Sequence, residues 1–106
     1  MVAHVKTENF SEAVLQSKVP VLVDFYAAWC GPCRLLSPVL DELAGESGGA
    51  YEIVKVDVDK EPELAARFGV TALPTLLLLE NGEVTERRVG LENKTTLRRL
   101  LRVGAA

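Results

Sequence analysis

The sequence predicts one α/β domain over residues 1–106, with a central mixed β-sheet flanked by α-helices. Three observations support this fold class. Strand-like and helix-like segments alternate through the first two thirds of the chain, the pair Asn81-Gly82 gives a strong hairpin signal, and an amphipathic segment closes the chain. Alternation followed by a hairpin and a closing helix implies a mixed sheet that lies between helices.

The N-terminal part is predicted to form a short edge strand at residues 2–5 and a helix that ends at about Gln16. Asn9 and Glu12 have the spacing of a capping pair at the start of this helix. The run VLVDFY at residues 21–26 is β-branched and aromatic, which is typical of a strand covered on both faces. The first inner strand is therefore expected there.

A long helix is expected next, from about Cys33 to the Gly48-Gly49 break, because apolar residues recur at helical spacing. Pro38 lies inside this segment and predicts a kink. Residues 53–58 have the pattern of a second inner strand, and residues 62–68 that of a short helix that begins with proline.

The last third of the chain contains the predicted hairpin and the closing helix. Residues 76–79 and 84–89 flank Asn81-Gly82 as the two strands of the hairpin. Asn93 can cap the final helix, whose leucines form an apolar face and whose arginines form a solvated one. We expect those arginines at the surface rather than in a site.

Composition and charge exclude several classes of function. The net charge is −3 and the basic residues are scattered among acidic ones, so nucleic acid is not an expected partner. The first residues lack a basic segment and a long apolar run, and no apolar stretch is long enough to span a bilayer. We therefore expect a cytoplasmic protein without membrane contact. In that compartment a disulfide is more often catalytic or redox-sensing than structural.

The motif WCGPC at residues 29–33 contains both cysteines of the chain, and three interpretations are open. A structural disulfide gains stability with loop length, and this short loop gives only roughly 2 kcal/mol against about 3 kcal/mol for a 15-residue loop. A structural zinc site normally needs four ligands, whereas His4 is the only histidine, so no metal site is expected. A redox pair needs two thiols on one helical face, which the i, i+3 spacing provides. We favour the redox interpretation.

The predicted helix gives each thiol a role. Cys30 lies near the positive end of the helix, where unpaired backbone N–H groups favour a thiolate, so we expect it to attack the substrate disulfide. Cys33 lies one turn further in. We expect it to stay a shielded thiol until a mixed disulfide has formed, and then to attack Cys30 and release the substrate.

With these motifs in view, the chain resembles the thioredoxin family over almost its whole length. The resemblance is carried by VDFYAAWCGPC, KVDVDKEPELAARFGV and LPTLLLLENGEV in that order, a combination far more specific than the cysteine spacing. It implies the thioredoxin fold and a general protein-disulfide reductase that maintains cell redox homeostasis. It also implies a redox-active Cys30–Cys33 disulfide with no bound cofactor, regeneration by an NADPH-dependent thioredoxin reductase, and disulfide-containing proteins as substrates of a monomer.

Gly31 and Pro32 bear on the direction of the reaction. Neither residue adds a positive charge or a hydrogen-bond donor that would favour the Cys30 thiolate, so the disulfide is comparatively favoured and the dithiol is a better reductant. Two alternatives stay open. A thiol oxidase or isomerase would be distinguished by its redox potential, and a noncatalytic interaction module by activity that survives loss of both thiols.

The resemblance also implies roles for Asp24 and Lys55. Taken alone, Asp24 inside VLVDFY is more often a hydrogen-bonded or solvent-reaching strand residue, and Lys55 can simply face solvent. The resemblance instead implies that Asp24 is buried beneath the cysteines and accepts the proton of Cys33 through water, with Lys55 nearby as a modulator of its charge. We expect burial to raise the pKa of Asp24 despite the Lys55 ammonium.

A docking surface is expected around the cysteines. Trp29 can be plain core, yet beside a redox pair it is expected to cover the site and contact partners. The resemblance implies that Leu73-Pro74 faces the cysteines with a cis peptide bond, which leaves the Leu73 backbone available to an extended substrate segment. The residues predicted to bind substrate are Trp29, Gly31, Pro32, Ala72, Leu73, Pro74, Val89, Gly90 and Leu91.

Some positions depart from the common choices of the family without changing the chemistry. Tyr26 stands where a tryptophan is frequent, and Arg34 stands where a lysine is usual. The remaining departures are Ala72, Leu79 and Leu91.

Overall fold

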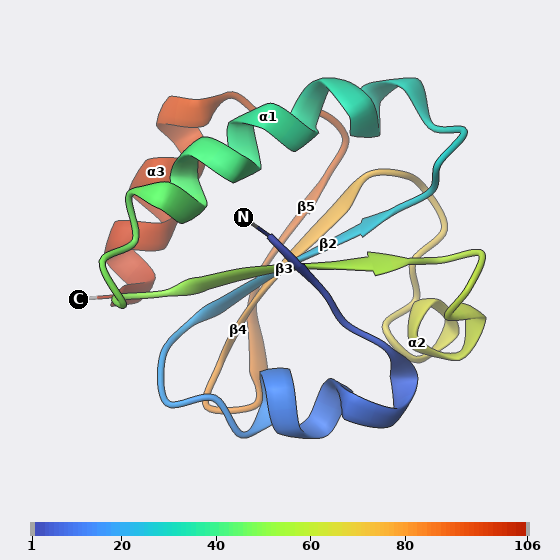
Figure 1. The fold of residues 1–106 in the computed structure, drawn as a ribbon, viewed down its shortest axis with the longest axis horizontal. Coiled ribbons are helices and arrows are strands. Elements are labelled where there is room, and N and C mark those ends of the chain that lie inside the picture. Colours follow the sequence, from blue (N-terminus) through green and yellow to red (C-terminus); the bar gives the residue numbers. More distant parts are fainter. Residues whose placement is uncertain (1, 106) are drawn as a thin grey trace.

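The computed structural model describes residues 2–105, and its centre is a five-stranded sheet with the strand order β1-β3-β2-β4-β5 (Figure 1). β3 runs parallel to both β1 and β2, whereas β4 runs antiparallel to β2 and β5 antiparallel to β4. The mixed sheet predicted from the sequence is therefore confirmed. The strands are β1 Ala3–His4, β2 Val21–Tyr26, β3 Glu52–Asp57, β4 Thr75–Glu80 and β5 Glu83–Val89.

Helices cover both faces of this sheet (Figure 1). α1 and α3 lie on one face, and α2 lies on the other together with two short N-terminal helical turns, η1 and η2. Among residues 2–105 no helix is both long and apolar enough to cross a membrane. The helical elements are η1 Thr7–Asn9, η2 Ser11–Leu15, α1 Gly31–Gly45, α2 Pro62–Arg67 and α3 Lys94–Ala105.

The sheet divides the apolar core in two, because successive side chains of a strand point to opposite faces. On β2, Leu22 packs with the leucines of α1 and α3, whereas Val23 and Phe25 pack with the side chains of η2 and α2. Asp24 shares the α1 side of β2 with Leu22. This alternation places a carboxylate, rather than another apolar side chain, next to the beginning of α1.

The predicted start of the N-terminal helix is wrong. Asn9 is the last residue of η1, and its Oδ1 accepts a hydrogen bond from the Lys6 N–H at 2.8 Å. Because this side chain reaches three residues back, Lys6 occupies the N-cap position and the chain continues through Phe10 into η2. The helical segment ends at Leu15, close to the predicted end at Gln16.

The predicted hairpin is confirmed, and its turn packs against the N-terminal segment. Asn81 and Gly82 have φ values of 53° and 80°, which lie in the left-handed region that a two-residue type I′ turn requires. A Cβ atom at Gly82 would lie 3.1 Å from the carbonyl oxygen of Leu15. Glycine is therefore needed there both for the turn and for the close approach of η2.

β5 forms an edge of the sheet and is rich in charge. Four of its seven residues, Glu83, Glu86, Arg87 and Arg88, are ionisable, and its pairing with β4 is interrupted by a register shift. The Arg87 guanidinium donates hydrogen bonds to the carbonyl oxygens of Phe68 and Gly69, both at 2.8 Å. The strand is thus tied to the loop after α2.

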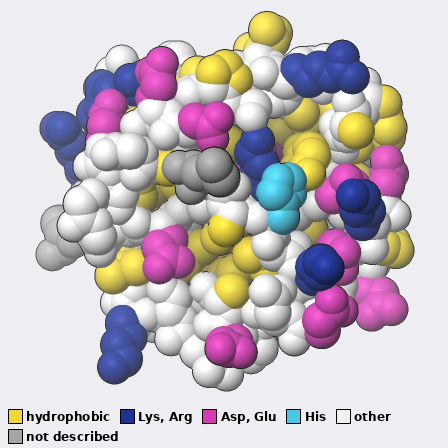
Figure 2. Space-filling view, viewed as in Figure 1, with side chains coloured by type: hydrophobic (Ala, Val, Ile, Leu, Met, Phe, Trp, Pro, Cys, Tyr) yellow, Lys and Arg dark blue, Asp and Glu magenta, His cyan; other side chains and the backbone are white. Residues whose placement is uncertain are grey.

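α3 is capped as predicted and is joined to α1 by ion pairs. The Asn93 Oδ1 accepts a hydrogen bond from the Thr96 N–H at 2.8 Å. The Arg98 guanidinium donates to both carboxylate oxygens of Glu46 at 2.9 Å, and Lys94 Nζ donates to Glu42 at 2.5 Å. On the face of the molecule in Figure 2, acidic and basic side chains are intermixed, as the scattered sequence positions predict.

Candidate active site

The two cysteines lie at the N-terminus of α1, directly after the loop that follows β2. Cys30 is the N-cap residue, and its Sγ accepts a hydrogen bond from the Cys33 N–H at 3.2 Å. The helix therefore begins at Gly31, earlier than the predicted start at Cys33, and Pro32 occupies the first turn, where its missing N–H costs no hydrogen bond. Cys30 and Cys33 form a disulfide, with their Cα atoms 5.3 Å apart.

The two cysteines border different spaces. Cys30 lines a surface groove of about 490 Å³, whereas Cys33 lines a smaller cavity of about 120 Å³ whose wall contains the buried Asp24. We expected Cys33 to be more shielded than Cys30. Both residues are instead 4% exposed, so the exposed fraction does not distinguish the attacking thiol from the resolving one. The surroundings do separate them, because mostly exposed residues line the groove beside Cys30, whereas the cavity beside Cys33 contains the buried carboxylate of Asp24.

Asp24 is the acidic residue of the smaller cavity. It is 1% exposed, and its Oδ1 has no hydrogen-bond partner among the residues that the structure describes. Burial raises the pKa of Asp24 to about 7, and the Lys55 ammonium opposes that rise only in part. The solvent-reaching interpretation of Asp24 is therefore wrong. The cavity is lined by Asp24, Tyr26, Ala27, Ala28, Cys33, Arg34, Ser37 and Lys55.

Lys55 lies on β3 directly beside Asp24 in the register of the parallel strands. Lys55 is half-buried. Its Nζ donates a hydrogen bond to Ser37 Oγ of α1 at 2.5 Å and lies 5.6 Å from the centre of the Tyr26 ring. The ammonium is thus held in the cavity wall, at a position from which it stabilises a charged Asp24.

Trp29 is exposed at the rim of the groove rather than part of the core. Its side chain is 69% exposed, and the indole Nε1–H donates a hydrogen bond to Asp59 Oδ2 at 2.8 Å. Asp59 belongs to the loop after β3, and its own N–H donates to Asp57 Oδ1. Sequence reasoning missed Asp59, because an aspartate in a charged loop carries no signal that an indole is its partner.

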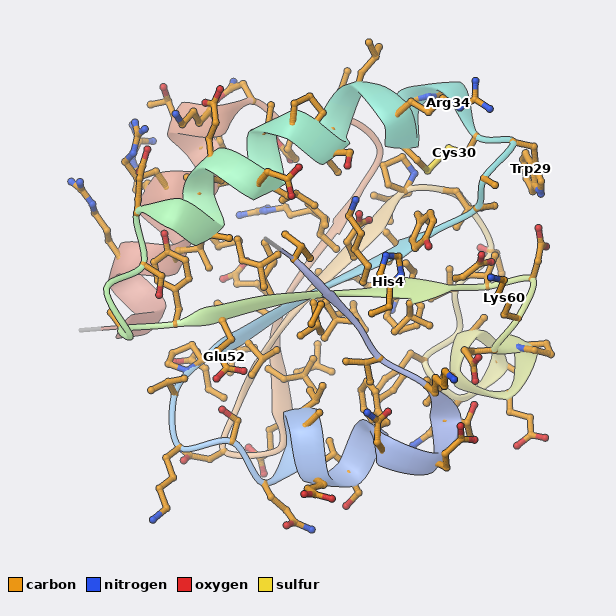
Figure 3. All side chains as sticks on the ribbon, viewed as in Figure 1. His4, Trp29, Cys30, Arg34, Glu52 and Lys60 are labelled. Atoms are coloured by element: carbon orange, nitrogen blue, oxygen red, sulfur yellow. A yellow bond between two sulfur atoms is a disulfide. The ribbon has the colours of Figure 1, made fainter. Side chains whose placement is uncertain are left out.

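Arg34 is a second residue that sequence reasoning did not place in the site. Its Nε and Nη2 donate to the carbonyl oxygen of Ala28 at 3.2 and 2.9 Å, so α1 is tied to the loop that leads to Cys30. Figure 3 shows Trp29, Cys30 and Arg34 together at one end of the molecule. The only available signal was the departure from the lysine that is usual in the family.

The Leu73-Pro74 peptide bond is cis, as the resemblance implied. Leu73 lines the groove, whereas Pro74 is buried and its carbonyl oxygen accepts a hydrogen bond from the Gly90 N–H at 2.9 Å. Gly90 has a φ of 95°. Its hydrogen bond to Pro74 holds the segment after β5 next to the start of β4.

The groove includes only part of the predicted docking surface. Five of the nine predicted residues line it, and Pro74, Val89, Gly90 and Leu91 do not. Val89 and Leu91 are nevertheless exposed apolar side chains, with exposed fractions of 58% and 53%. Sequence reasoning missed three groove residues that come from the loops after β3 and α2. The groove is lined by Trp29, Cys30, Gly31, Pro32, Val58, Val70, Thr71, Ala72 and Leu73.

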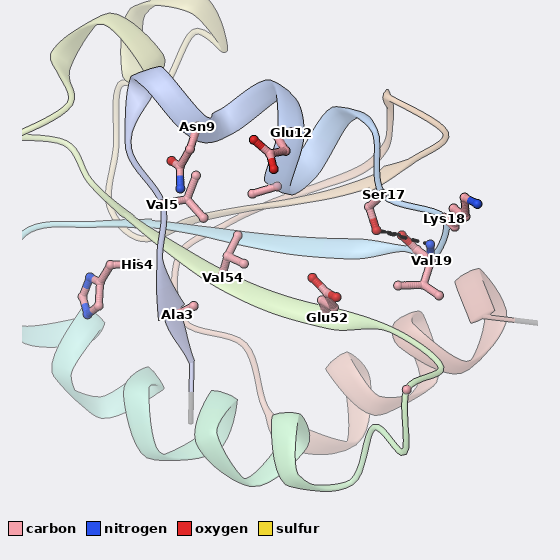
Figure 4. Close-up of a pocket in the computed structure, with 12 residues that line it drawn as sticks. Ala3, His4, Val5, Asn9, Glu12, Ser17, Lys18, Val19, Glu52 and Val54 are labelled. Carbon is pink, nitrogen blue, oxygen red and sulfur yellow. Dashed lines mark hydrogen bonds between the residues drawn. The ribbon is translucent and has the colours of Figure 1, made fainter.

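A larger hollow lies away from the cysteines (Figure 4). It has a volume of about 620 Å³ and lies between β1, β3 and the N-terminal turns, with His4, Glu12 and Glu52 among its residues. It contains neither cysteine, so size alone does not locate the chemistry of this protein. Among residues 2–105 no three His, Cys, Asp or Glu side chains are grouped as ligands for a metal ion.

Comparison with known proteins identifies the family of this chain. The family model described as Thioredoxin matches residues 1–103. The chain is 48% identical over 96 residues to "Thioredoxin" of Haemophilus influenzae, an alignment that covers 91% of this chain and 90% of that protein. It is 44% identical over 99 residues to "Thioredoxin 1" of Nostoc sp., which covers 93% of this chain and 92% of that protein. It is 39% identical over 97 residues to "Thioredoxin" of Rickettsia felis, with 92% of each chain covered.

Proposed function

This chain belongs to the thioredoxin family, and we propose that it is a general reductase of protein disulfides. It is a thiol–disulfide oxidoreductase whose redox-active group is the Cys30–Cys33 pair. The observation that carries the proposal is the position of this pair, across the N-cap of α1, between an open groove and a cavity with a buried carboxylate.

In the first step, the Cys30 thiolate attacks one sulfur atom of the substrate disulfide. A bond forms between Cys30 Sγ and that sulfur, the substrate S–S bond breaks, and the second substrate sulfur leaves as a thiolate that takes up a proton. The Cys33 N–H, which points at Cys30 Sγ, and the positive end of α1 both favour the attacking thiolate.

In the second step, Cys33 resolves the mixed disulfide. Asp24 accepts the proton of Cys33, and its raised pKa makes it a base suited to near-neutral pH. The Cys33 thiolate attacks Cys30 Sγ, which restores the disulfide of the protein and releases the remaining substrate sulfur. Two electrons have then passed to the substrate, and Asp24 returns its proton to the leaving sulfur or to solvent.

We propose that the substrate docks as an extended segment beside Leu73. Within residues 2–105 the main chain of Leu73 makes no hydrogen bond, so its polar groups are available to pair with another chain. Exposed apolar side chains surround this position, with Trp29 on the rim of the groove and Val89 and Leu91 on the segment at the end of β5. We therefore expect this surface to select substrates by the shape of an extended segment and by main-chain hydrogen bonds, and not by the charge of the substrate.

The electron source that we propose is an NADPH-dependent thioredoxin reductase. Each turnover leaves Cys30 and Cys33 oxidised, so a two-electron donor must restore the dithiol before the next substrate. We also propose a cytoplasmic location and a monomeric working form. A dithiol that donates electrons suits a compartment that keeps thiols reduced.

The test couples the purified protein to NADPH and thioredoxin reductase and follows NADPH consumption with a disulfide-bonded test protein. We expect catalytic turnover, and none from a Cys30→Ser/Cys33→Ser double variant as the matched control. The equilibrium potential of Cys30–Cys33 should be more reducing than that of glutathione. A potential well above that of glutathione, together with no turnover, would instead assign a thiol oxidase or isomerase.

A further inference from the structure

Tyr26 lies between the Asp24 cavity and a neighbouring pocket on the surface. It is the last residue of β2, and among the residues that the structure describes it alone lines both the cavity of Asp24 and a surface pocket of about 230 Å³ next to His4. The aromatic ring of Tyr26 is therefore a wall between the buried carboxylate and solvent on this side of the molecule.

The outer side of this wall is anchored by His4. The Tyr26 hydroxyl lies 3.1 Å from His4 Nδ1, and the two rings meet edge to face with their centres 5.8 Å apart. His4 belongs to β1, where it pairs in register with Lys55 of β3. The position of His4 is thus set by the pairing of β1 with β3.

The inner side of the wall contacts the basic group of the cavity. The Lys55 ammonium lies 5.6 Å from the centre of the Tyr26 ring, a distance at which the ring face attracts a cation. A displaced ring would therefore both admit water to Asp24 and remove one of the two contacts that hold Lys55, the other being its hydrogen bond to Ser37.

The charged and titratable groups around Asp24 and Tyr26 come from three elements. β3 contributes Lys55 beside Asp24 and Asp57 beside Tyr26, and β1 contributes His4. α1 contributes Cys33 and Arg34, and the Arg34 guanidinium bonds to the Ala28 carbonyl oxygen. The surface pocket adds Lys6, Lys60 and Glu61 on its outer side.

We propose that Tyr26, tethered by His4, is a positioning residue for the second exchange step, because its ring shields Asp24 and Lys55 on one side of the cavity. The inference rests on the proposed function, in which Asp24 accepts the proton of Cys33. The raised pKa of Asp24 agrees with this shielding, since burial is the main cause of that rise.

The experiment measures the ionisation midpoint of Asp24 directly, by carbon NMR of its carboxyl group in the reduced protein, and the two exchange rates by stopped-flow mixing. The variants are Tyr26→Ala, which removes the ring, Tyr26→Phe, which removes only the hydroxyl contact with His4, and His4→Ala, which removes both the hydroxyl contact and the ring contact. Tyr51→Phe is the matched control, because the Tyr51 hydroxyl donates a hydrogen bond to the Leu43 carbonyl oxygen, away from the cavity.

We expect the midpoint of Asp24 to fall by about one pH unit in Tyr26→Ala and by less in the two tether variants, because burial is the largest cause of the raised pKa and a loosened Lys55 opposes the fall only in part. The second exchange step should slow several-fold near neutral pH, while the first step, made by Cys30, keeps its rate. His4→Ala should have at least the effect of Tyr26→Phe, because it also removes the ring contact, and combining the two should add nothing to His4→Ala, because the hydroxyl contact is already lost. Tyr51→Phe should match the parent in every measurement.

A folded Tyr26→Ala variant with the parental midpoint and the parental second step would overturn the inference. If that variant does not fold, the two tether variants decide, and parental values in both would overturn the role of His4. Failure of the proposed function is a separate result, namely a parent protein that reduces no test protein. The NMR midpoint then still tests whether the wall controls Asp24.

Discussion

Asp24 and Glu46 are carboxylates near opposite ends of α1, each close to a lysine, and their pKa values move in opposite directions. Burial raises the pKa of Asp24 to about 7, whereas hydrogen bonds from Arg98 and then Lys94 lower the pKa of Glu46 to about 2. Glu46 lies at the surface with both oxygens paired to one guanidinium.

The difference shows that the surroundings of a carboxylate, and not its residue type, set its pKa in this fold. At the end of α1, water and well-placed donors favour the ionised carboxylate, so the acid joins α1 to α3. At the start of α1, burial with few partners disfavours ionisation and leaves a group that can take up a proton near neutral pH. A carboxylate whose pKa is raised by burial is expected to lower the free energy of unfolding at neutral pH.

The largest expected effect tests whether Cys33, which lies beside Asp24 in the cavity, is the resolving cysteine. Cys33→Ser should accumulate mixed disulfides with substrate proteins and lose turnover, because no thiol remains to resolve them. Cys30→Ser should trap few substrates. Affinity capture followed by electrophoresis with and without reductant measures both, and equal trapping by the two variants contradicts the division of roles.

The next prediction compares the two carboxylates in catalysis. Asp24→Asn should slow the second exchange step by about 100-fold near neutral pH, because an amide cannot accept the proton of Cys33. The first step should change little. Stopped-flow mixing with a disulfide substrate separates the steps, and Glu46→Gln is the surface control that keeps both parental rates. An Asp24→Asn variant with the parental second step would remove Asp24 from the mechanism.

A smaller effect is expected on stability, and its sign is set by the raised pKa of Asp24. Below about pH 4 the group is protonated in both the folded and the unfolded chain and costs nothing. Between about pH 4 and pH 7 the unfolded chain ionises first, so the folded state loses about 1.4 kcal/mol per pH unit, and above that window the loss is constant.

Asp24→Asn should therefore become more stable than the parent as pH rises through this window. Urea unfolding of both proteins at a series of pH values measures the difference in the free energy of unfolding. A difference that is flat with pH, or a variant less stable than the parent at neutral pH, would show that Asp24 is ionised at no cost in the fold.

The smallest expected effect is at Glu46, with the opposite dependence on pH. A lowered pKa stabilises the folded state above the usual glutamate range, and that stabilisation is lost as pH falls toward about 2. Glu46→Gln should cause a small loss at neutral pH that disappears in acid and shrinks with added salt, since exposed ion pairs are screened. Thermal unfolding at low and high salt measures it, and a large loss insensitive to salt would contradict a surface pair.

The sequence was sufficient to predict those elements whose structure depends on a local pattern of residues. The run VLVDFY predicts a strand with two covered faces, and Asn81-Gly82 predicts a tight turn from the backbone conformations that these residues accept. At Asn9 the same kind of reasoning failed, because its side chain can bond to an N–H ahead of it or behind it.

The site was predicted less completely, because several of its contacts join residues far apart in the chain. The hydrogen bond from Trp29 to Asp59 and the contact of Tyr26 with His4 depend on how the loops and the edge strand meet in space. No local pattern in the sequence specifies them. The burial of Asp24 came from the family resemblance, since residue type alone favours an aspartate that reaches solvent.

The charged edge strand β5 has a consequence for the behaviour of the protein at high concentration. An exposed strand edge is a template on which another chain can add, and this is a common beginning of aggregation and fibre growth. Glu83, Glu86, Arg87 and Arg88 on β5, together with its irregular pairing to β4, make such addition unfavourable. Arg87→Val and Arg88→Val would leave an apolar run there and make precipitation during storage the first sign of the change.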